Sequence, residues 1–286
     1  PYSKDAQFDY AKFYEVTYES QRLMDDLVEL ELEAIERILN KIDKDEEPVH
    51  IKRVEKETWQ LLYDTGKKAR RTGLGFTGLG DAFAAMGYSF DSSEAMELTD
   101  NIMKCKCKAE FNSSTDMAVE RGQFESFDPK HEEKSEFNDM LKTEFPELHE
   151  RMMKNGRRNI SISTVAPTGT LSMLTQTTSG IEPAFMLSYK RRRKVNPDTD
   201  SSKVSYVDDL GDKWEEFTVY HHKLKTWMDK TGETDIEKSP YQNSTASEIN
   251  WLKRVELQSI VQKYVTHSIS STINLPNDVS PEKVGD

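Results

Sequence analysis

Apolar residues recur every three or four positions along much of this chain, which is the spacing of one face of an α-helix. The longest such stretch starts after Asp9, a residue suited to capping a helix, and continues to about Ile42. Its apolar face is expected to pack on a sheet and comprises Phe13, Val16, Leu23, Leu27, Leu30, Ala34 and Ile38. The same spacing predicts helices over 51–71, 92–120, 131–155, 214–230 and 248–267.

Two short stretches have instead the two-residue period of a β-strand. Residues 159–163 alternate so that Ile160 and Ile162 share one face, as in a half-buried strand. A second strand is predicted over 268–275, ending at Pro276. Because long helical stretches separate such strands, parallel pairing through helical crossovers is expected. The pattern predicts a helix-rich α/β fold with mostly parallel strands, and a surface loop over the polar stretch 194–212.

A turn follows the strand at 159–163. Pro167 ends that strand because proline has no N–H to donate, and Thr-Gly-Thr at 168–170 leads into the apolar run 171–174. A helix start exposes unpaired N–H groups, hydroxyls add donors, and glycine permits close approach, so phosphate is the natural ligand here. An ordinary turn capped by Thr or Ser fits the same residues. The turn is not a P-loop, since no lysine follows the glycine.

Four glycines fall within residues 73–80, where the backbone can approach a neighbour closely or adopt positive φ. The spacing superficially resembles a dinucleotide-binding loop. No apolar strand precedes it and no βαβ unit follows it, as that loop requires. A tight turn packed against another element is therefore the favoured interpretation.

Two cysteines, Cys105 and Cys107, lie one residue apart in a predicted helix. The lysines at 104, 106 and 108 would favour a lowered thiol pKa, although two plain helix residues explain the pattern as simply. Two thiols without a nearby histidine do not complete a zinc site, so no metal is expected. Such cysteine usage favours a reducing, cytoplasmic setting.

The charge of the chain limits its partners. Lys and Arg number 39 and Asp and Glu number 51, a net charge of −12, which opposes broad binding to nucleic acid but permits a local phosphate site. No run of 18 apolar residues is present, so no membrane span is expected. The basic run at 191–193 and the histidines at 221 and 222 are expected to be solvated surface residues.

Several of these stretches together resemble a known family. They are APTGTLSM at 166–173, SGIEPAF at 179–185, the tyrosine and basic cluster at 189–193, RRTGLGFTGLGDAFAAMG at 70–87 and HSISSTINLP at 267–276. The chain resembles the catalytic large subunit of ribonucleotide reductases over about residues 8–280, and is most similar to the adenosylcobalamin-dependent class. Adenosylcobalamin, bound by the complete assembly, is the cofactor that this resemblance implies.

The resemblance implies a role for the turn at 168–170. In that family this turn holds the phosphates of the ribonucleotide substrate through backbone amides and hydroxyls. By position, the phosphate-binding residues are Thr168, Gly169, Thr170, Leu171 and Ser172. Pro167 and Glu182 are expected to lie near the substrate, and a structural role for Glu182 fits as well. Whether the substrate is a di- or triphosphate is left open.

The resemblance also implies that this chain is one part of a larger enzyme assembly. The family fold is a ten-stranded α/β barrel, and residues 1–286 match a single partial domain, much of the second half-barrel. The finger loop with its N-x-C-x-E motif is absent, as is the last strand, so no catalytic residue is assigned to this chain.

Companion polypeptides are therefore expected to carry the first half-barrel, the finger loop, the C-terminal cysteines and the site for a deoxynucleotide effector. Two alternatives remain open. The chain could belong to the class that takes its radical from a separate di-metal subunit, or it could be a non-catalytic scaffold that keeps the phosphate-binding fold.

Overall fold

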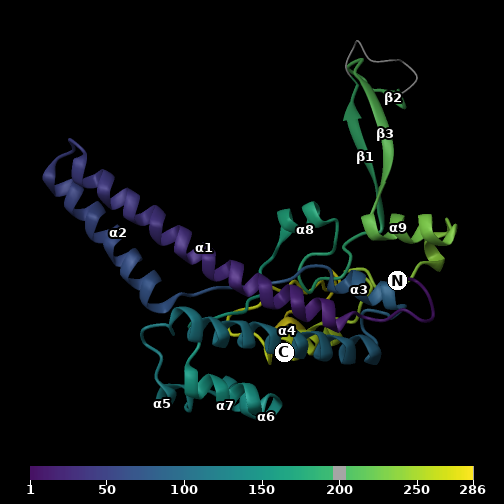
Figure 1. Cartoon of the computed structure of the whole chain (residues 1–286). Coiled ribbons are helices and arrows are strands. Elements are labelled where there is room, and N and C mark those ends of the chain that lie inside the picture. Colours follow the sequence, from purple (N-terminus) through teal and green to yellow (C-terminus); the bar gives the residue numbers. More distant parts are fainter. Residues whose placement is uncertain (196–203, 286) are drawn as a thin grey trace.

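The computed structural model describes residues 1–195 and 204–285 (Figure 1). Its two longest helices, α1 (Tyr10–Lys44) and α4 (Ser93–Arg121), pack against each other. Helix α2 (Val49–Ala69) runs back along α1, and the two form an arm that extends beyond the body of the molecule. The helices predicted from Asp9 to about Ile42, over 51–71 and over 92–120 are thereby confirmed. The N-cap at Asp9 is confirmed too, since its side chain accepts a hydrogen bond from Lys12 N.

The expected packing face of α1 is wrong. Leu23, Leu27 and Leu30 are 63%, 56% and 56% exposed, so the middle of the predicted stripe faces solvent, while Phe13 at its start packs against the main core. The buried face carries polar as well as apolar residues and comprises Thr17, Gln21, Asp25, Val28, Leu32, Ile35 and Ile42. The reason is a buried polar network, in which Gln21 donates to Asn159 Oδ1 at 3.0 Å, that attaches α1 to the rest of the fold.

The remaining helices are short. They are α3 (Leu79–Met86), α5 (Pro129–Glu132), α6 (Glu136–Glu144), α7 (Pro146–Asn155), α8 (Gly169–Thr175), α9 (His222–Thr231), a 3-10 helix (Ile236–Lys238), α10 (Trp251–Gln262) and α11 (Pro281–Gly285). The helix predicted over 131–155 is in fact several, and one break lies at Phe145, because the residue before a proline is disfavoured in helical conformation. None of the described helices could cross a membrane.

The regular strands form a projecting three-stranded sheet in the order β1-β3-β2 (Figure 1). Strands β1 (Ser188–Lys194), β2 (Tyr206–Val207) and β3 (Lys213–Tyr220) pair antiparallel, from Ser188 opposite Tyr220 to Lys194 opposite Trp214. The prediction of mostly parallel strands is therefore wrong for these strands. The helix predicted over 214–230 is confirmed for its second half, which is α9, and is wrong for its first half, which is β3. Aromatic and β-branched residues favour a strand there, and Glu215 and Glu216 pair across it with basic residues of β1. Of the surface loop expected over 194–212, residues 196–203 lie outside the described part.

Parallel pairing is confined to isolated bridges in the body of the molecule. Leu74 bridges Ser163, and Val165 bridges Ile269, both parallel. Backbone bonds join the same segments, for example Leu74 N to Ile162 O at 2.8 Å and Ser270 N to Val165 O at 2.7 Å. The strands predicted at 159–163 and 268–275 are thus extended segments lying side by side, not continuous strands.

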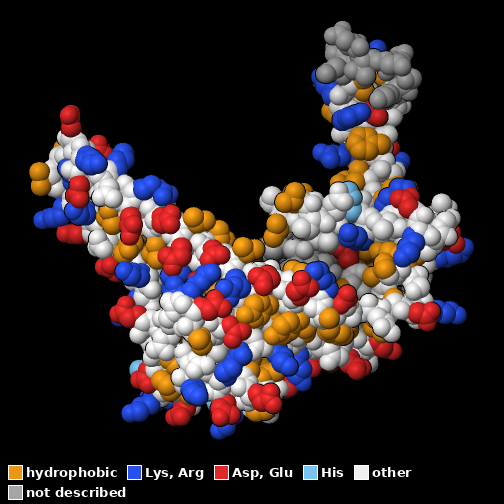
Figure 2. Space-filling view, viewed as in Figure 1, with side chains coloured by type: hydrophobic (Ala, Val, Ile, Leu, Met, Phe, Trp, Pro, Cys, Tyr) orange, Lys and Arg blue, Asp and Glu red, His pale blue; other side chains and the backbone are white. Residues whose placement is uncertain are grey.

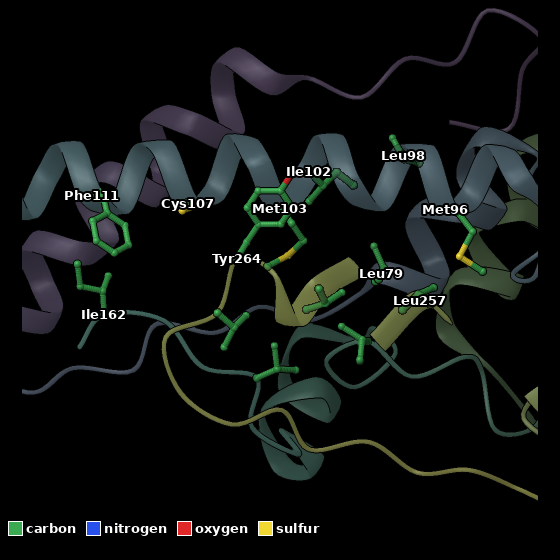
Figure 3. Packing of buried hydrophobic residues seen from close by; sticks show 14 of the residues in the cluster. Leu79, Met96, Leu98, Ile102, Met103, Cys107, Phe111, Ile162, Leu257 and Tyr264 are labelled. Carbon is green, nitrogen blue, oxygen red and sulfur yellow. The ribbon is translucent and has the colours of Figure 1, made fainter. Parts of the chain in front are cut away.

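The main hydrophobic core lies between α4 and these extended segments. Figure 3 shows Phe111, Met103 and Leu98 along α4, with Tyr264 and Ile162 approaching from the facing segments. A smaller buried cluster joins α3 and α9 and comprises Ala84, Ala184, Leu224, Trp227 and Tyr241. Val165 and Ile181 belong to the main core and Ala184 to the smaller cluster, so the two clusters anchor the chain on either side of the turn at 166–170.

Candidate functional site

The turn that begins α8 has an unusual backbone. Thr168, the N-cap residue, has φ of 52° and ψ of 27°, in the left-handed region that β-branched residues rarely adopt. Its Oγ1 accepts a hydrogen bond from the backbone N–H of Gly180 at 3.0 Å, which ties the turn to the following loop. A tertiary contact thus holds a strained residue in place, a condition that is common at functional sites.

Three backbone N–H groups precede the first hydrogen bond of α8. That bond runs from Ser172 N to Thr168 O at 2.8 Å, so the N–H groups of Gly169, Thr170 and Leu171 have no acceptor within the helix. In the described part of the chain, the Thr168 side chain caps none of them. All three residues are exposed. The turn can therefore offer several donors to one anion.

The hydroxyls predicted to bind phosphate divide into two kinds. Ser172 Oγ donates to Gly169 O at 3.0 Å and lies 2.8 Å from Ser179 Oγ, and Ser172 is buried. Thr170 and Pro167 are both exposed residues. Thr170 thus presents a hydroxyl outward, while those of Thr168 and Ser172 stabilise the turn from within.

A cleft of about 710 Å³ lies beside this turn, a volume typical of small-ligand sites. Ser179, the partner of Ser172, is on its wall, so the cleft and the turn are contiguous. The cleft mixes hydroxyl, charged and apolar side chains and is lined by Thr177, Thr178, Ser179, Glu182, Pro183, Ala184, Phe185, Met186, Tyr189, His221, Ala246, Thr272 and Asn274.

Glu182 contributes a carboxylate to this cleft and also has a structural role. Its Oε1 accepts from Thr272 N at 3.0 Å and lies 3.2 Å from Nη2 of Arg254. Arg254 is 1% exposed, and burial lowers the pKa of its guanidinium. Both interpretations of Glu182 from the sequence therefore fit its position, since it faces the cleft and balances a buried cation.

His221 is not the plain surface residue expected from the sequence. Its Nε2 lies 2.6 Å from Oδ1 of Asp81, its side chain is 15% exposed, and it lines the cleft. The same Oδ1 accepts from Tyr241 OH at 2.7 Å, and Asp81 Oδ2 accepts from Thr178 N at 2.7 Å. Burial, then the charge of Asp81, raises the pKa of Tyr241 well above its usual value. No local pattern could reveal a pair that is 140 residues apart.

The glycine-rich stretch is a close-packed turn, as favoured above. A Cβ on Gly73 would lie 3.0 Å from Cγ2 of Thr164, and one on Gly80 would lie 2.9 Å from the carbonyl oxygen of Glu182. Gly80 therefore allows the start of α3 to pack directly on the cleft loop. Its role is structural packing beneath the candidate site.

The two cysteines do not have the lowered pKa that the flanking lysines suggested. Burial raises the pKa of Cys105 and, much more strongly, that of Cys107, which is fully buried on α4. Within the described residues, no cluster of His, Cys, Asp and Glu could hold a metal ion.

The basic run on β1 is exposed, and members of it form ion pairs with glutamates of the neighbouring strand β3. For example, Arg193 Nε lies 2.6 Å from Glu215 Oε2.

Comparisons with known proteins agree with this architecture. The family model described as "Ribonucleotide reductase, barrel domain" matches residues 2–286. A vitamin B12-dependent ribonucleoside-diphosphate reductase of Mycobacterium tuberculosis (strain CDC 1551 / Oshkosh) is 28% identical over 237 residues, covering 78% of this chain and 30% of the relative. The protein of the same name from Thermoplasma acidophilum is 24% identical over 283 residues, covering 97% of this chain and 31% of the relative.

A relative from Danio rerio, named ribonucleoside-diphosphate reductase large subunit, is 28% identical over 136 residues, covering 45% of this chain and 17% of the relative. The chain thus spans about a third or less of the length of the curated relatives that it matches. The family match extends over nearly every residue, including the turn at α8 and the cleft. The chain therefore belongs to the ribonucleotide reductase barrel-domain family.

Proposed function

We propose that this chain is a part of a ribonucleotide reductase that binds the phosphates of a ribonucleoside di- or triphosphate. The complete enzyme would convert the ribonucleotide to a 2′-deoxyribonucleotide by radical chemistry. Support comes from the family match and from relatives named as ribonucleoside-diphosphate reductases. The chain itself contributes substrate binding, and none of its residues is assigned a catalytic role.

The observation that carries this proposal is the uncapped start of α8. The N–H groups of Gly169, Thr170 and Leu171 lie in succession beside the exposed Thr170 hydroxyl. Thr168 and Ser172 complete the turn by holding its shape through bonds to Gly180 and Ser179. Backbone donors with no side-chain cap suit a diphosphate, whose oxygens accept several hydrogen bonds at once.

The contiguous cleft would hold the nucleoside. Glu182 faces it and Pro167 lies at the edge of the turn, so both would lie near the proposed substrate. The exposed apolar side chains of Phe185 and Met186 offer a surface for a planar base. In this arrangement, one ribonucleotide would have its phosphates at the start of α8 and its base in the cleft.

A companion polypeptide is part of the proposal. Figure 2 shows hydrophobic side chains along the upper edge of the α1 arm and over α8. Exposed apolar residues of these two helices are Leu23 and Leu27 on α1 and Met173 and Leu174 on α8, of which the last two are 72% and 80% exposed. Contiguous exposed apolar surface is normally covered by a partner. The companion would supply the first half of the barrel, the finger loop, the C-terminal cysteines and the effector site, with residues 1–286 forming one partial domain of a cytoplasmic enzyme.

Adenosylcobalamin is proposed as the cofactor of the complete assembly, from the names of the relatives. The cleft has the volume of a nucleotide-sized ligand and is proposed above to hold the substrate. No residue of this chain is therefore assigned to the cofactor. When bound, it would supply the radical.

A second candidate is the class with a separate radical-generating subunit, which the Danio rerio relative favours because its name carries no B12 dependence. Adding adenosylcobalamin to the reconstituted assembly distinguishes the two, because only the cobalamin class depends on it. A third candidate is a non-catalytic scaffold that keeps the phosphate site. It predicts ribonucleotide binding without turnover in the presence of either radical source.

Calorimetric titration of a ribonucleoside diphosphate onto the reconstituted assembly tests the phosphate site. Thr170→Val removes the exposed hydroxyl and should weaken binding by about 1.5–3 kcal/mol, the range for a hydrogen bond to a charged group. Ser172→Ala should weaken binding by disturbing the turn. Thr58→Val, on exposed α2, is the matched control and should bind normally. Unchanged affinity in both Thr170→Val and Ser172→Ala would contradict the assignment of a phosphate site to this turn.

A further inference from the structure

The imidazole of His221 is held in one orientation on the wall of the cleft. Its Nε2 lies 2.6 Å from Asp81 Oδ1, and its ring packs edge-on against Tyr241 with centroids 5.4 Å apart. Its backbone N–H donates to Leu187 O at 2.9 Å. Asp81 belongs to the first turn of α3 and is itself fixed by Thr178 N, so three elements meet at this histidine.

The partners of Asp81 determine which ring nitrogen carries the proton. An ionised carboxylate accepts hydrogen bonds only, and Asp81 accepts from the tyrosine hydroxyl, the Thr178 amide and His221. Nε2 is therefore the protonated nitrogen of the neutral ring, and Nδ1 is left with a lone pair. Among the described residues, Nδ1 has no hydrogen-bond partner, and it is not one of the buried unpaired atoms.

We propose that His221 is a specificity-determining residue of the cleft, whose Nδ1 accepts a hydrogen bond from a hydroxyl or N–H group of the bound nucleoside. This inference rests on the proposed ribonucleotide site. The phosphates at α8 need no acceptor, because a phosphate presents oxygens. The nucleoside half of the ligand carries sugar hydroxyls and base amino groups, and these are the donors that an imidazole lone pair recognises.

The surroundings of His221 favour a role in ligand recognition over a purely structural role for this side chain. Asp81, Tyr241 and Thr178 hold the ring from the protein side, so its orientation is fixed before any ligand binds. Side chains held in advance lose little entropy on binding. His222, the next residue, is exposed and lies outside the cleft lining, and it provides a natural comparison.

Two substitutions separate ligand recognition from structural support. His221→Gln places an amide N–H where Nε2 lies, so the bond to Asp81 can persist while the cleft acceptor is lost. His221→Asn places its amide near Nδ1, which keeps a polar group at the cleft and loses the bond to Asp81. His222→Gln is the matched control.

The measurement is calorimetric titration of the reconstituted assembly with a ribonucleoside diphosphate and, separately, with inorganic pyrophosphate, together with thermal unfolding of each variant. We expect His221→Gln to bind the nucleotide about threefold to tenfold more weakly, with pyrophosphate binding and the unfolding midpoint unchanged. His221→Asn should bind more nearly like wild type but unfold at a lower temperature. His222→Gln should match wild type throughout.

Three results would overturn the inference. If His221→Gln binds the nucleotide like wild type while Thr170→Val weakens binding, the inference fails and the phosphate site stands. If His221→Gln weakens nucleotide and pyrophosphate equally, His221 acts on the turn at α8 and not on the nucleoside. If the wild-type assembly binds neither ligand, the proposed function fails and the inference fails with it.

Discussion

The ammonium nitrogen of Lys106 lies 2.5 Å from Oε1 of Glu110, one turn further along α4, and both side chains are at most 2% exposed. The same nitrogen donates to Leu74 O and to Ser163 Oγ, each at 2.9 Å. One buried cation thus joins the longest core helix to two of the extended segments. Burial raises the pKa of Glu110 even with this partner beside it.

Lys106→Met should lower the free energy of unfolding by about 3–5 kcal/mol, because it leaves the Glu110 carboxylate buried without its cation. Urea denaturation followed by circular dichroism measures this. Adding Glu110→Leu should recover part of the loss, since the unpaired charge is then removed. The control is Lys104→Met, whose partly exposed pair with Glu144 should contribute less than about 1 kcal/mol, because Glu144 keeps its second partner Lys263. Equal losses at 104 and 106 would contradict the prediction.

Asp25 makes a second buried charge network, with a definite dependence on pH. Its side chain is fully buried, and Arg70 Nε, Arg158 Nε and Asn159 Nδ2 lie 2.9, 3.2 and 3.0 Å from its oxygens. Burial alone would raise the pKa of Asp25, but Arg70, Arg158 and Asn159 together hold it below the usual value. A lowered folded-state pKa contributes stability above the unfolded value of about 3.9, and that stability is lost as the pH falls further.

Asp25→Asn should therefore destabilise the chain by about 3 kcal/mol near neutral pH, because Arg70 and Arg158 lose their buried counter-charge and keep only the half-exposed Glu29. The difference from wild type should shrink as the pH falls below about 4, because the unfolded wild-type chain then binds a proton at Asp25 while the folded chain still resists protonation there. Urea denaturation at several pH values between 7 and 3 gives the comparison. A difference that stays constant across this range would show that Asp25 acts through its shape alone.

The network at Asp25 also explains what the sequence could and could not reveal about α1. Apolar spacing located the helix correctly, but Leu23 and Leu27 lie on the exposed face. The buried face carries Gln21 and Asp25, which pattern analysis places on the solvent side. Their shared partner Asn159 is more than a hundred residues away from both, so the satisfied network is visible only in three dimensions.

The candidate site likewise has one part that the sequence reveals and another that only the structure reveals. The turn at 168–172 is a continuous motif, and local chemistry identified it as a helix start with free donors. His221 and Asp81 belong to no motif, and they come together only because α3 and α9 share a small core. Residues 214–220 were misassigned to a helix because apolar spacing there fits both periods, and cross-strand ion pairs with β1 decide in favour of a strand.

Two glycines should respond in opposite directions to alanine. A Cβ on Gly80 would lie 2.9 Å from a backbone oxygen of the cleft loop, so Gly80→Ala should cost about 1–3 kcal/mol of stability. Gly66, inside α2, would make only an ordinary contact with Leu32 at 3.4 Å. Gly66→Ala should therefore stabilise the helix by about 0.5–1 kcal/mol. Thermal unfolding of both variants checks the signs. An unchanged midpoint for Gly80→Ala would contradict the close approach inferred at Gly80, and a lowered midpoint for Gly66→Ala would contradict the ordinary contact inferred at Gly66.

The thiols should react slowly in the folded chain. Cys107 is fully buried, and burial raises its pKa and that of Cys105, so little of either side chain is thiolate at neutral pH. With Ellman's reagent at pH 8, Cys105 should label more slowly than free cysteine, and Cys107 should label only when the chain unfolds. A Cys105→Ser variant should then show no labelling before denaturant is added, and two thiols in the denatured wild type against one in the variant confirm the count. Rapid labelling of this variant in its native state would mean that α4 opens locally, because nothing else would expose the sulfur of Cys107.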